Sequence, residues 1–265
     1  MPLRNSWEGV GSDMAQLGMN QIQGYLEGRE FSSGLQVRVV PAAPGPAPET
    51  DRQARILALC AGQRVVHLGC CDHVPLIRDK IAAGIWLHGR LTAAASQCLG
   101  VDVDADAVRY VRDELGYDNV VCADLSRDAP AGLTSGGWDW MVAGEIVEHL
   151  DDPVRFLSQL RETAVSHCRG LVVTVPNALR LENGMLALRG IECVNTDHRY
   201  WFTPFTIAKV LTRAGFRCES VDFVHGYPLP APRGIRSWLT SRLLRRRPML
   251  RDTLVATALF QPPPA

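Results

Sequence analysis

The sequence predicts an α/β fold in which a mostly parallel sheet carries helices on both faces. From Glu49 onward, short apolar runs alternate with helical segments, the order that produces βαβ units. The runs are almost continuously apolar, as expected of strands buried on both faces. With 265 residues, of which 46% are hydrophobic and 21% charged, the chain is long enough to bury a sizeable core.

The elements follow from these apolar and helical patterns in chain order. A helix is expected at Asp13–Glu27, a short strand at Leu35–Val40, and a linker in the Pro-rich stretch Pro41–Pro48. A helix should then run from Glu49 to about Ala61. The predicted parallel strands are Val65–Leu68, Cys98–Val103, Asn119–Cys122, Trp138–Ala143 and Gly170–Val175. Helical residues should continue to Ala95 after the first of these strands, with later helices near Ala105–Leu115, Pro153–Val165 and Thr203–Ala214.

Two last strands, Arg217–Val224 and Thr253–Phe260, enclose a Pro-rich and Arg-rich insertion. We therefore divide the chain into residues 1–48, a helical lid with its linker, and residues 49–265, the α/β domain with a basic insertion near 226–251. The lid would exclude water from a site.

Charge and cysteine usage exclude several classes of protein. Lys+Arg 28 balance Asp+Glu 28, so the electrostatic footprint of a nucleic-acid-binding protein is missing. No apolar stretch approaches the roughly 18 residues that cross a bilayer, and we expect a cytoplasmic protein. The 8 cysteines are scattered without a CxxC pair, which argues against a zinc site and against disulfides. We expect no metal.

The ends of the predicted strands carry the chemistry, because ligands of open α/β sheets bind beyond the carboxyl ends of the strands. Gly69 follows the first parallel strand and lets the backbone approach a ligand closely. Asp102 ends the second strand, where its carboxylate can accept two hydrogen bonds from ribose hydroxyls. Asp124 and Glu145 follow the next two strands, so acidic residues end three strands in succession.

Further motifs come later in the chain. They are Glu145–Leu150 followed by Asp152 and Pro153, Val175-Pro176-Asn177, and Asp197–Pro204 with Ala214-Gly215-Phe216. Together with the strand ends, this ordered set resembles the class I S-adenosylmethionine-dependent methyltransferases, and within them the ubiquinone-biosynthesis type. The resemblance covers roughly Arg64 to Phe260. It implies a Rossmann-like, seven-stranded, mostly parallel sheet with an antiparallel terminal strand, S-adenosylmethionine as cofactor, and methyl transfer to oxygen or nitrogen of a small molecule, either a secondary metabolite or a saccharide-containing acceptor.

The same resemblance assigns roles to single residues. Gly69 would belong to the cofactor loop, Asp102 would contact the ribose, and Asp124 would contact the adenine amino group. Val103 and Leu125 would border the adenine ring. The remaining candidates for cofactor binding are His67, Cys70, Asp72, Gly144 and Glu145.

The loop after the first parallel strand departs from the family pattern. The family has Gly-x-Gly-x-Gly there, whereas Cys71 and His73 replace the second and third glycines. About 33 residues separate Gly69 from Asp102, so Ile85–Ser96 reads as an insertion. An altered loop leaves a non-catalytic methyltransferase-like partner protein as the alternative function. A nicotinamide-dependent reductase is disfavoured because the glycine fingerprint is broken.

His149 and His198 are the candidate catalytic residues. A hydroxyl acceptor must lose a proton, and imidazole titrates near neutral pH. The same residues can instead brace a helix or orient the acceptor, and the sequence leaves both readings open.

The segment Arg233–Arg251 combines arginines with Trp238, Leu239, Leu243 and Leu244 at helical spacing. Two readings remain: contact with an anionic group or membrane surface, and, as we expect, a solvated helix that packs one apolar face. The partner we expect is a small-molecule acceptor. The oligomeric state stays open.

Overall fold

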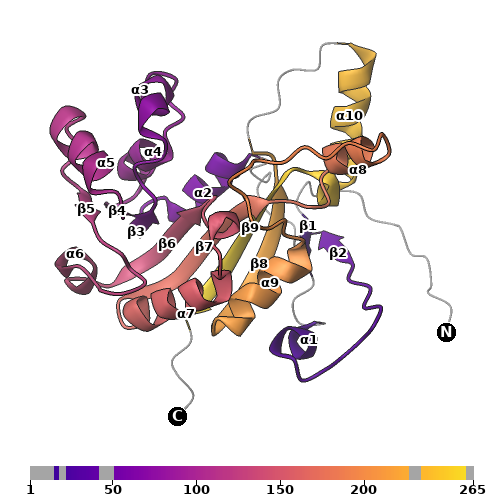
Figure 1. The fold of residues 1–265 in the computed structure, drawn as a ribbon, viewed down its shortest axis with the longest axis horizontal. Coiled ribbons are helices and arrows are strands. Elements are labelled where there is room, and N and C mark those ends of the chain that lie inside the picture. The colour runs from indigo at the N-terminus through magenta and orange to yellow at the C-terminus, as the bar shows by residue number, and fades with distance from the viewer. Residues whose placement is uncertain (1–14, 18–21, 42–50, 227–233, 261–265) are drawn as a thin grey trace.

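The computed structural model describes residues 15–17, 22–41, 51–226 and 234–260 (Figure 1). Within these ranges the strands form one nine-stranded sheet of order β2-β1-β8-β9-β7-β6-β3-β4-β5. The strands are β1 Ala15–Leu17, β2 Val39–Pro41, β3 Arg64–Leu68, β4 Gln97–Asp102, β5 Val120–Cys122, β6 Trp138–Gly144, β7 Cys168–Pro176, β8 Phe216–Val224 and β9 Thr253–Phe260.

The sheet confirms the predicted fold class. Strands β3 to β7 are parallel to one another, and β9 is inserted antiparallel between β7 and β8. These seven strands are the ones expected from the sequence. From β3 the chain adds β4 and β5 on one side and then crosses back to add β6 and β7 on the other side. The strand order therefore reverses at β3, and a ligand crevice is expected beyond the carboxyl end of this strand.

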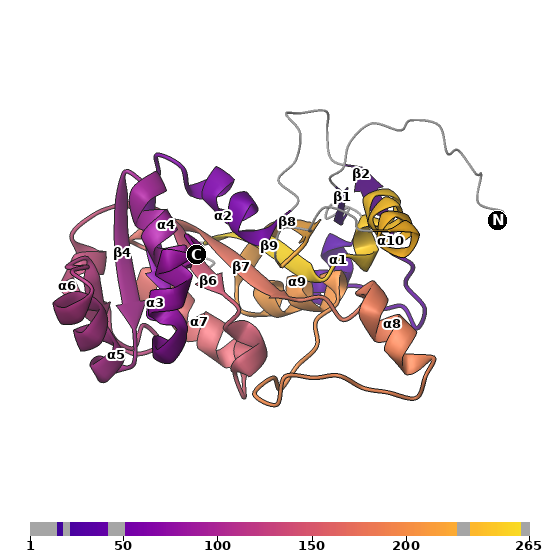
Figure 2. The same ribbon diagram turned by 90° about the horizontal axis from the view of Figure 1, so that it is seen from above.

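Helices cover both faces of the sheet, as Figure 2 shows from above. The alternation of side chains along the strands assigns each residue to a face. Val65, Val142 and Val172 pack in one cluster with residues of α2 and α4, whereas their neighbours Val66 and Met141 pack in another with residues of α7 and α9. The helices are α1 Gln23–Glu27, α2 Arg52–Cys60, α3 Val74–Ala82, α4 Leu87–Ala94, α5 Ala105–Arg109, α6 Ala131–Thr134, α7 Pro153–Ala164, α8 Leu181–Ala187, α9 Pro204–Arg213 and α10 Ile235–Arg246.

Local sequence explains where the helices nearest the site begin. The Asp51 side chain accepts hydrogen bonds from the backbone N–H groups of Gln53 and Ala54 and so caps α2. Thr203 caps α9 in a capping box with Thr206, and Pro204 occupies the first helical position. These caps fix the start of each helix next to a strand end.

The N-terminal segment differs from the prediction. The helix expected over Asp13–Glu27 is wrong at Ala15–Leu17, which is a strand; of the residues of this segment that the structure describes, Gln23–Glu27 are helical. β1 pairs antiparallel with β2 and with β8, and so covers an edge of β8 that would otherwise be open. Local periodicity in the sequence cannot reveal such a pairing between distant segments. Leu26 of α1 is buried in the core. Apart from Pro41, the expected linker lies outside the described residues, and the division into lid and domain stays a prediction.

The predicted insertion Ile85–Ser96 forms α4, with Trp86 and His88 buried. Helix Ala105–Leu115 is present as α5 followed by a π-helical turn, η2 Tyr110–Glu114. Within the described ranges, no helix combines the length and apolar character needed to cross a bilayer.

At Gly100 in β4, the insertion Ile85–Ser96 packs so closely against the sheet that there is no room for a side chain. A Cβ atom there would lie 2.7 Å from His88 Cε1 and 2.8 Å from Cys70 Sγ. We therefore expect Gly100→Ala to lower the free energy of unfolding by about 1–3 kcal/mol, measured by urea denaturation. Gly137→Ala is the control, because a Cβ atom at Gly137 meets nothing within 4 Å. Equal losses in the two variants would contradict this packing.

Candidate active site

Backbone strain marks the loops after β3 and β6. Among the described residues, the non-glycine residues with positive φ are Asp72 and Glu145, at 54° and 56°. Such conformations cost free energy and cluster at functional sites. Both lie beyond the carboxyl ends of parallel strands, where the sequence places the cofactor loop and an acidic residue.

The loop after β3 is held against β4. The backbone N–H of Gly69, where φ is +63°, donates to the carbonyl of Val101 at 2.9 Å. Asp72 forms an ion pair with Lys80, whose Nζ lies 2.6 Å from Oδ2. Cys70 and Cys71 are buried beneath the turn. Cys71 therefore packs inward, whereas His73 is exposed.

Asp102 joins this loop to the end of β4. Its Oδ2 accepts the backbone N–H of Cys71 at 3.0 Å, and its Oδ1 accepts that of Asp104 at 3.1 Å. A carboxylate oxygen has two lone pairs, so each oxygen can accept one more hydrogen bond. The side chain is half-buried. It can therefore hold the loop and bind two hydroxyl groups at once.

Asp124 is fixed in a similar way after β5. Its Oδ1 accepts hydrogen bonds from the Ser126 hydroxyl at 2.6 Å and the Ser126 backbone N–H at 3.0 Å. These bonds lower the pKa of the Asp124 carboxyl. Val103 is 71% exposed, whereas Leu125 lies in the hydrophobic core. Val103 thus offers exposed apolar surface next to Asp102. The expected contact of Leu125 with the adenine ring stays a prediction.

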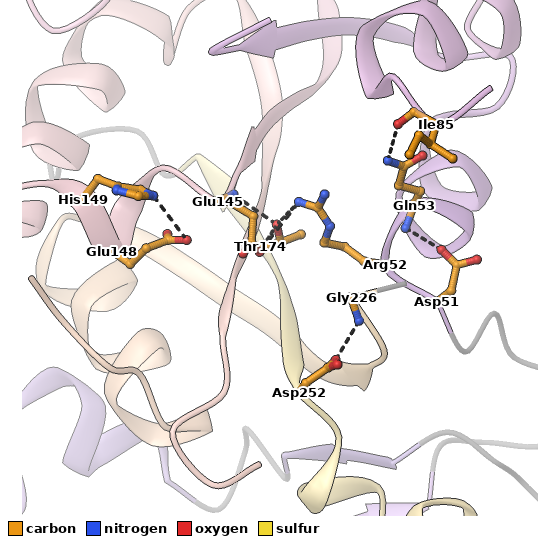
Figure 3. Close-up of polar contacts among 10 residues, drawn as sticks. All are labelled: Asp51, Arg52, Gln53, Ile85, Glu145, Glu148, His149, Thr174, Gly226 and Asp252. Carbon is orange, nitrogen blue, oxygen red and sulfur yellow. Dashed lines mark hydrogen bonds and ion pairs between the residues drawn. The ribbon is translucent and has the colours of Figure 1, made fainter. Parts of the chain in front are cut away.

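Glu145, directly after Gly144 at the end of β6, belongs to a polar cluster from three elements (Figure 3). The Thr174 hydroxyl of β7 donates to Glu145 Oε1 at 3.0 Å and accepts from the Glu145 backbone N–H at 3.2 Å. Arg52 of α2 lies 3.7 Å from Glu145 Oε1 and donates to the same hydroxyl at 3.4 Å. Arg52 and Thr174 were not predicted, since they reach the site only through tertiary packing.

The two predicted catalytic histidines come together. His149 ends the 3₁₀ turn η3 Val147–His149, and the ring centroid of His198, from the segment after α8, lies 4.7 Å away. His149 Nδ1 is 3.3 Å from the carbonyl of Asp197. The Nδ1 atom of His198 is buried and has no hydrogen-bond partner in the described part of the chain. Partial burial and the neighbouring His149 lower the pKa of His198.

Glu148, beside this pair, is a further residue that was not among the predicted site residues. Its side chain is fully buried, and neither carboxylate oxygen has a hydrogen-bond partner among the described residues. Oε1 lies 3.9 Å from His149 Nε2 (Figure 3). Burial and the nearby Glu145 raise the pKa of the Glu148 carboxyl to about 8. Its position next to His149 in the sequence was the available signal.

One potential ligand atom from each of Glu148, His149 and His198 lies within 4.8 Å of the others, so one cation could contact all three. The Glu148 oxygens and His198 Nδ1, which lack hydrogen-bond partners among the described residues, fit the role of cation ligands. The sequence had led us to expect no metal. Cys70, Cys71 and Asp102 are equally close together. They fit a metal less well: the neighbouring Cys71 thiol and burial raise the pKa of Cys70, so it stays a thiol.

His67, a predicted cofactor residue, lies inside the fold. It is buried in β3, and its Nδ1 is 3.4 Å from Nδ1 of His88. Burial lowers the pKa of His67 well below its ordinary value and that of His88 to about 4. The pair is therefore neutral at pH 7 and lies in the interior of the fold.

A cavity of about 490 Å³ lies between the N-terminal segment and the start of α9. Its lining includes Phe31, Leu179, Phe205 and Met249, with Lys209 among the polar residues. Leu179 follows β7, so this cavity and the polar site share a connecting segment.

Comparisons with known proteins give similarity of limited strength. No family model and no curated protein matches the sequence. A solved structure of magnesium protoporphyrin IX methyltransferase (ChlM) from Synechocystis PCC 6803 with bound SAH is 16% identical, with 79% of this chain and 82% of that chain covered and a TM-score of 0.47. A SAM-dependent methyltransferase from Aquifex aeolicus is 15% identical, with 80% and 91% covered and a TM-score of 0.47. At these values we draw no functional conclusion from either.

The buried histidines make stability depend on pH. Unfolded His88 takes up a proton near pH 6.5, whereas folded His88 does so only near pH 4, so stability is fully present above pH 6.5 and falls as the pH drops toward 4. The shift corresponds to a loss on the order of 3 kcal/mol. The measurement is the free energy of unfolding by urea denaturation at pH 7.5 and at pH 5. The decrease from pH 7.5 to pH 5 should be smaller for His88→Gln than for wild type. The exposed His73→Gln should keep the wild-type difference, and a His88→Gln variant that also keeps it would contradict the assignment.

Proposed function

We propose that this chain transfers a methyl group from S-adenosylmethionine to oxygen or nitrogen of a small molecule, such as a secondary metabolite or a saccharide-containing acceptor. One observation carries the proposal: Asp102 ends β4, and Asp124 and Glu145 follow β5 and β6, at one edge of the sheet next to the Gly69 turn. This edge is where open α/β sheets bind nucleotides.

The geometry of the acids supports a division of labour toward the cofactor. Asp102 would accept the ribose hydroxyls, since both of its oxygens keep a lone pair. Asp124 would accept the adenine amino group, with the ring against exposed Val103. The negative charge of Glu145 would favour the cationic sulfonium. Asp72 and Gly144 would complete the contacts, with the buried residues His67, Cys70 and Leu125 supporting them from below.

The acceptor side needs positioning and a proton sink. The sulfonium already supplies a reactive methyl group, so the protein chiefly holds the acceptor in line with the methyl–sulfur bond. A hydroxyl acceptor must also lose its proton, for which His149 and His198 are placed side by side. The volume of the cavity beside α9 suits a small molecule.

We further propose that Glu148, His149 and His198 hold a divalent cation. A bound cation would lower the pKa of a coordinated hydroxyl. It would also give Glu148 and His198 the partners that they lack among the described residues. If the protein takes up no cation, the two histidines keep the role of base.

Titration calorimetry with S-adenosylmethionine tests the cofactor assignment. We expect Asp102→Ala to weaken binding by about 10- to 100-fold, because hydrogen bonds to a charged group are lost. Asp106→Ala removes the same charge from a highly exposed site four residues away and should bind as wild type does. If wild-type protein binds no S-adenosylmethionine, the non-catalytic scaffold becomes the better account.

Cation binding is tested by titrating Mn²⁺ into chelator-treated protein and measuring free Mn²⁺ by electron paramagnetic resonance. Wild type should bind Mn²⁺ stoichiometrically. Glu148→Gln should bind it at least about 10-fold more weakly, because it replaces a charged ligand with a neutral one. The control is Glu162→Gln, an exposed glutamate on α7. No Mn²⁺ binding by wild type, or equal loss in both variants, would remove the cation site and leave the cofactor proposal untouched.

A further inference from the structure

Helix α10 exposes its apolar residues instead of burying them. Ile235, Trp238, Leu239 and Leu243 recur at positions i, i+3, i+4 and i+8 and therefore share one face. All four are exposed, Trp238 by 49% and Leu239 by 52%. Among the residues of α10 whose burial is described, Leu244 is the buried one, and it lies on another face. This contradicts the expectation of a solvated helix whose apolar face packs on the protein.

The charges around this face have one sign. From Gly234 to Arg251 the sequence contains arginines and no acidic residue. Arg242, Arg245 and Arg246 are exposed. The Arg242 guanidinium lies over the Trp238 ring at 5.5 Å from its centroid, so charge and aromatic surface are presented together.

The helix is attached firmly at one end and projects at the other. It packs chiefly on the 3₁₀ turn η4 Pro248–Leu250, and the buried Arg251 donates from Nε to the carbonyl of Leu244 at 3.4 Å. Figures 1 and 2 both place α10 at the end of the molecule opposite α5 and α6. α8, whose Met185 is exposed, lies at the same end as α10.

We propose that α10 docks on an anionic lipid surface. An interfacial helix lies in the membrane plane with Trp and Leu at the headgroup and acyl boundary and with basic residues beside lipid phosphates. The exposed Trp and Leu of α10 and its arginines match both parts of that arrangement. An RNA strand would use the arginines but would leave the aliphatic stripe exposed. The inference does not depend on the proposed methyl transfer.

Co-sedimentation of the full chain with vesicles tests the proposal. Vesicles of phosphatidylcholine mixed with phosphatidylglycerol should bind the wild type, and pure phosphatidylcholine vesicles should bind it much more weakly. Arg245→Ser with Arg246→Ser should lower the partition coefficient about 30-fold, given the contribution of each basic residue near an anionic surface. Leu239→Ser should lower it by about 5- to 10-fold.

Two control variants remove the same groups from the opposite end. Arg109→Ser with Arg112→Ser deletes two exposed charges, and Leu76→Ser deletes a leucine that is 48% exposed. Both should bind vesicles as wild type does. Equal loss in the control variants, or no binding of wild type to anionic vesicles, overturns the proposal. Binding of single-stranded RNA without vesicle binding would assign the arginines to nucleic acid, and self-association abolished by Leu239→Ser would assign the face to a second copy of this chain.

Discussion

Parallel pairing of β3 with β4 and with β6 is the constraint on which the candidate site depends. Leu68 lies opposite Val101 on one side and Ala143 on the other, so all three strands end at nearly the same level. Asp102 is the first residue after Val101, and Glu145 is the second residue after Ala143. A shift of one residue in either pairing would turn the side chains to the other face of the sheet. The hydrophobic clusters on the two faces therefore fix the position of the acids.

The sequence contained enough to predict the sheet and the acids, because both depend on local pattern. Buried parallel strands are apolar runs, and the residue after each run falls at the ligand edge. It did not contain the partners of Glu145: Arg52 and Thr174 arrive from α2 and β7, and their contact exists only after packing. The N-terminal strand β1 was not predicted for the same reason, since it forms by pairing with the edge of β8.

Glu148 shows why burial cannot be read from a motif. The sequence places it beside His149, which makes it look like one more polar residue of a loop. In the structure, its carboxylate is surrounded by packed side chains and has no hydrogen-bond partner among the described residues. Burial of the charged form is costly, so the pKa of about 8 keeps the Glu148 carboxyl largely protonated at pH 7. A cation at this place would couple ligand binding to folding.

The zero net charge conceals two oppositely charged regions. Asp102 and Asp124 belong to the β4 and β5 side of the sheet, whereas the arginines of α10 lie at the other end of the molecule (Figure 1). Because charges separated by more than about 10 Å are largely screened in physiological salt, the two regions act independently of each other. The acids can attract a cationic cofactor while the arginines attract an anionic surface. Net charge alone argues against a nucleic-acid partner, but it does not describe the like charges that collect on one helix.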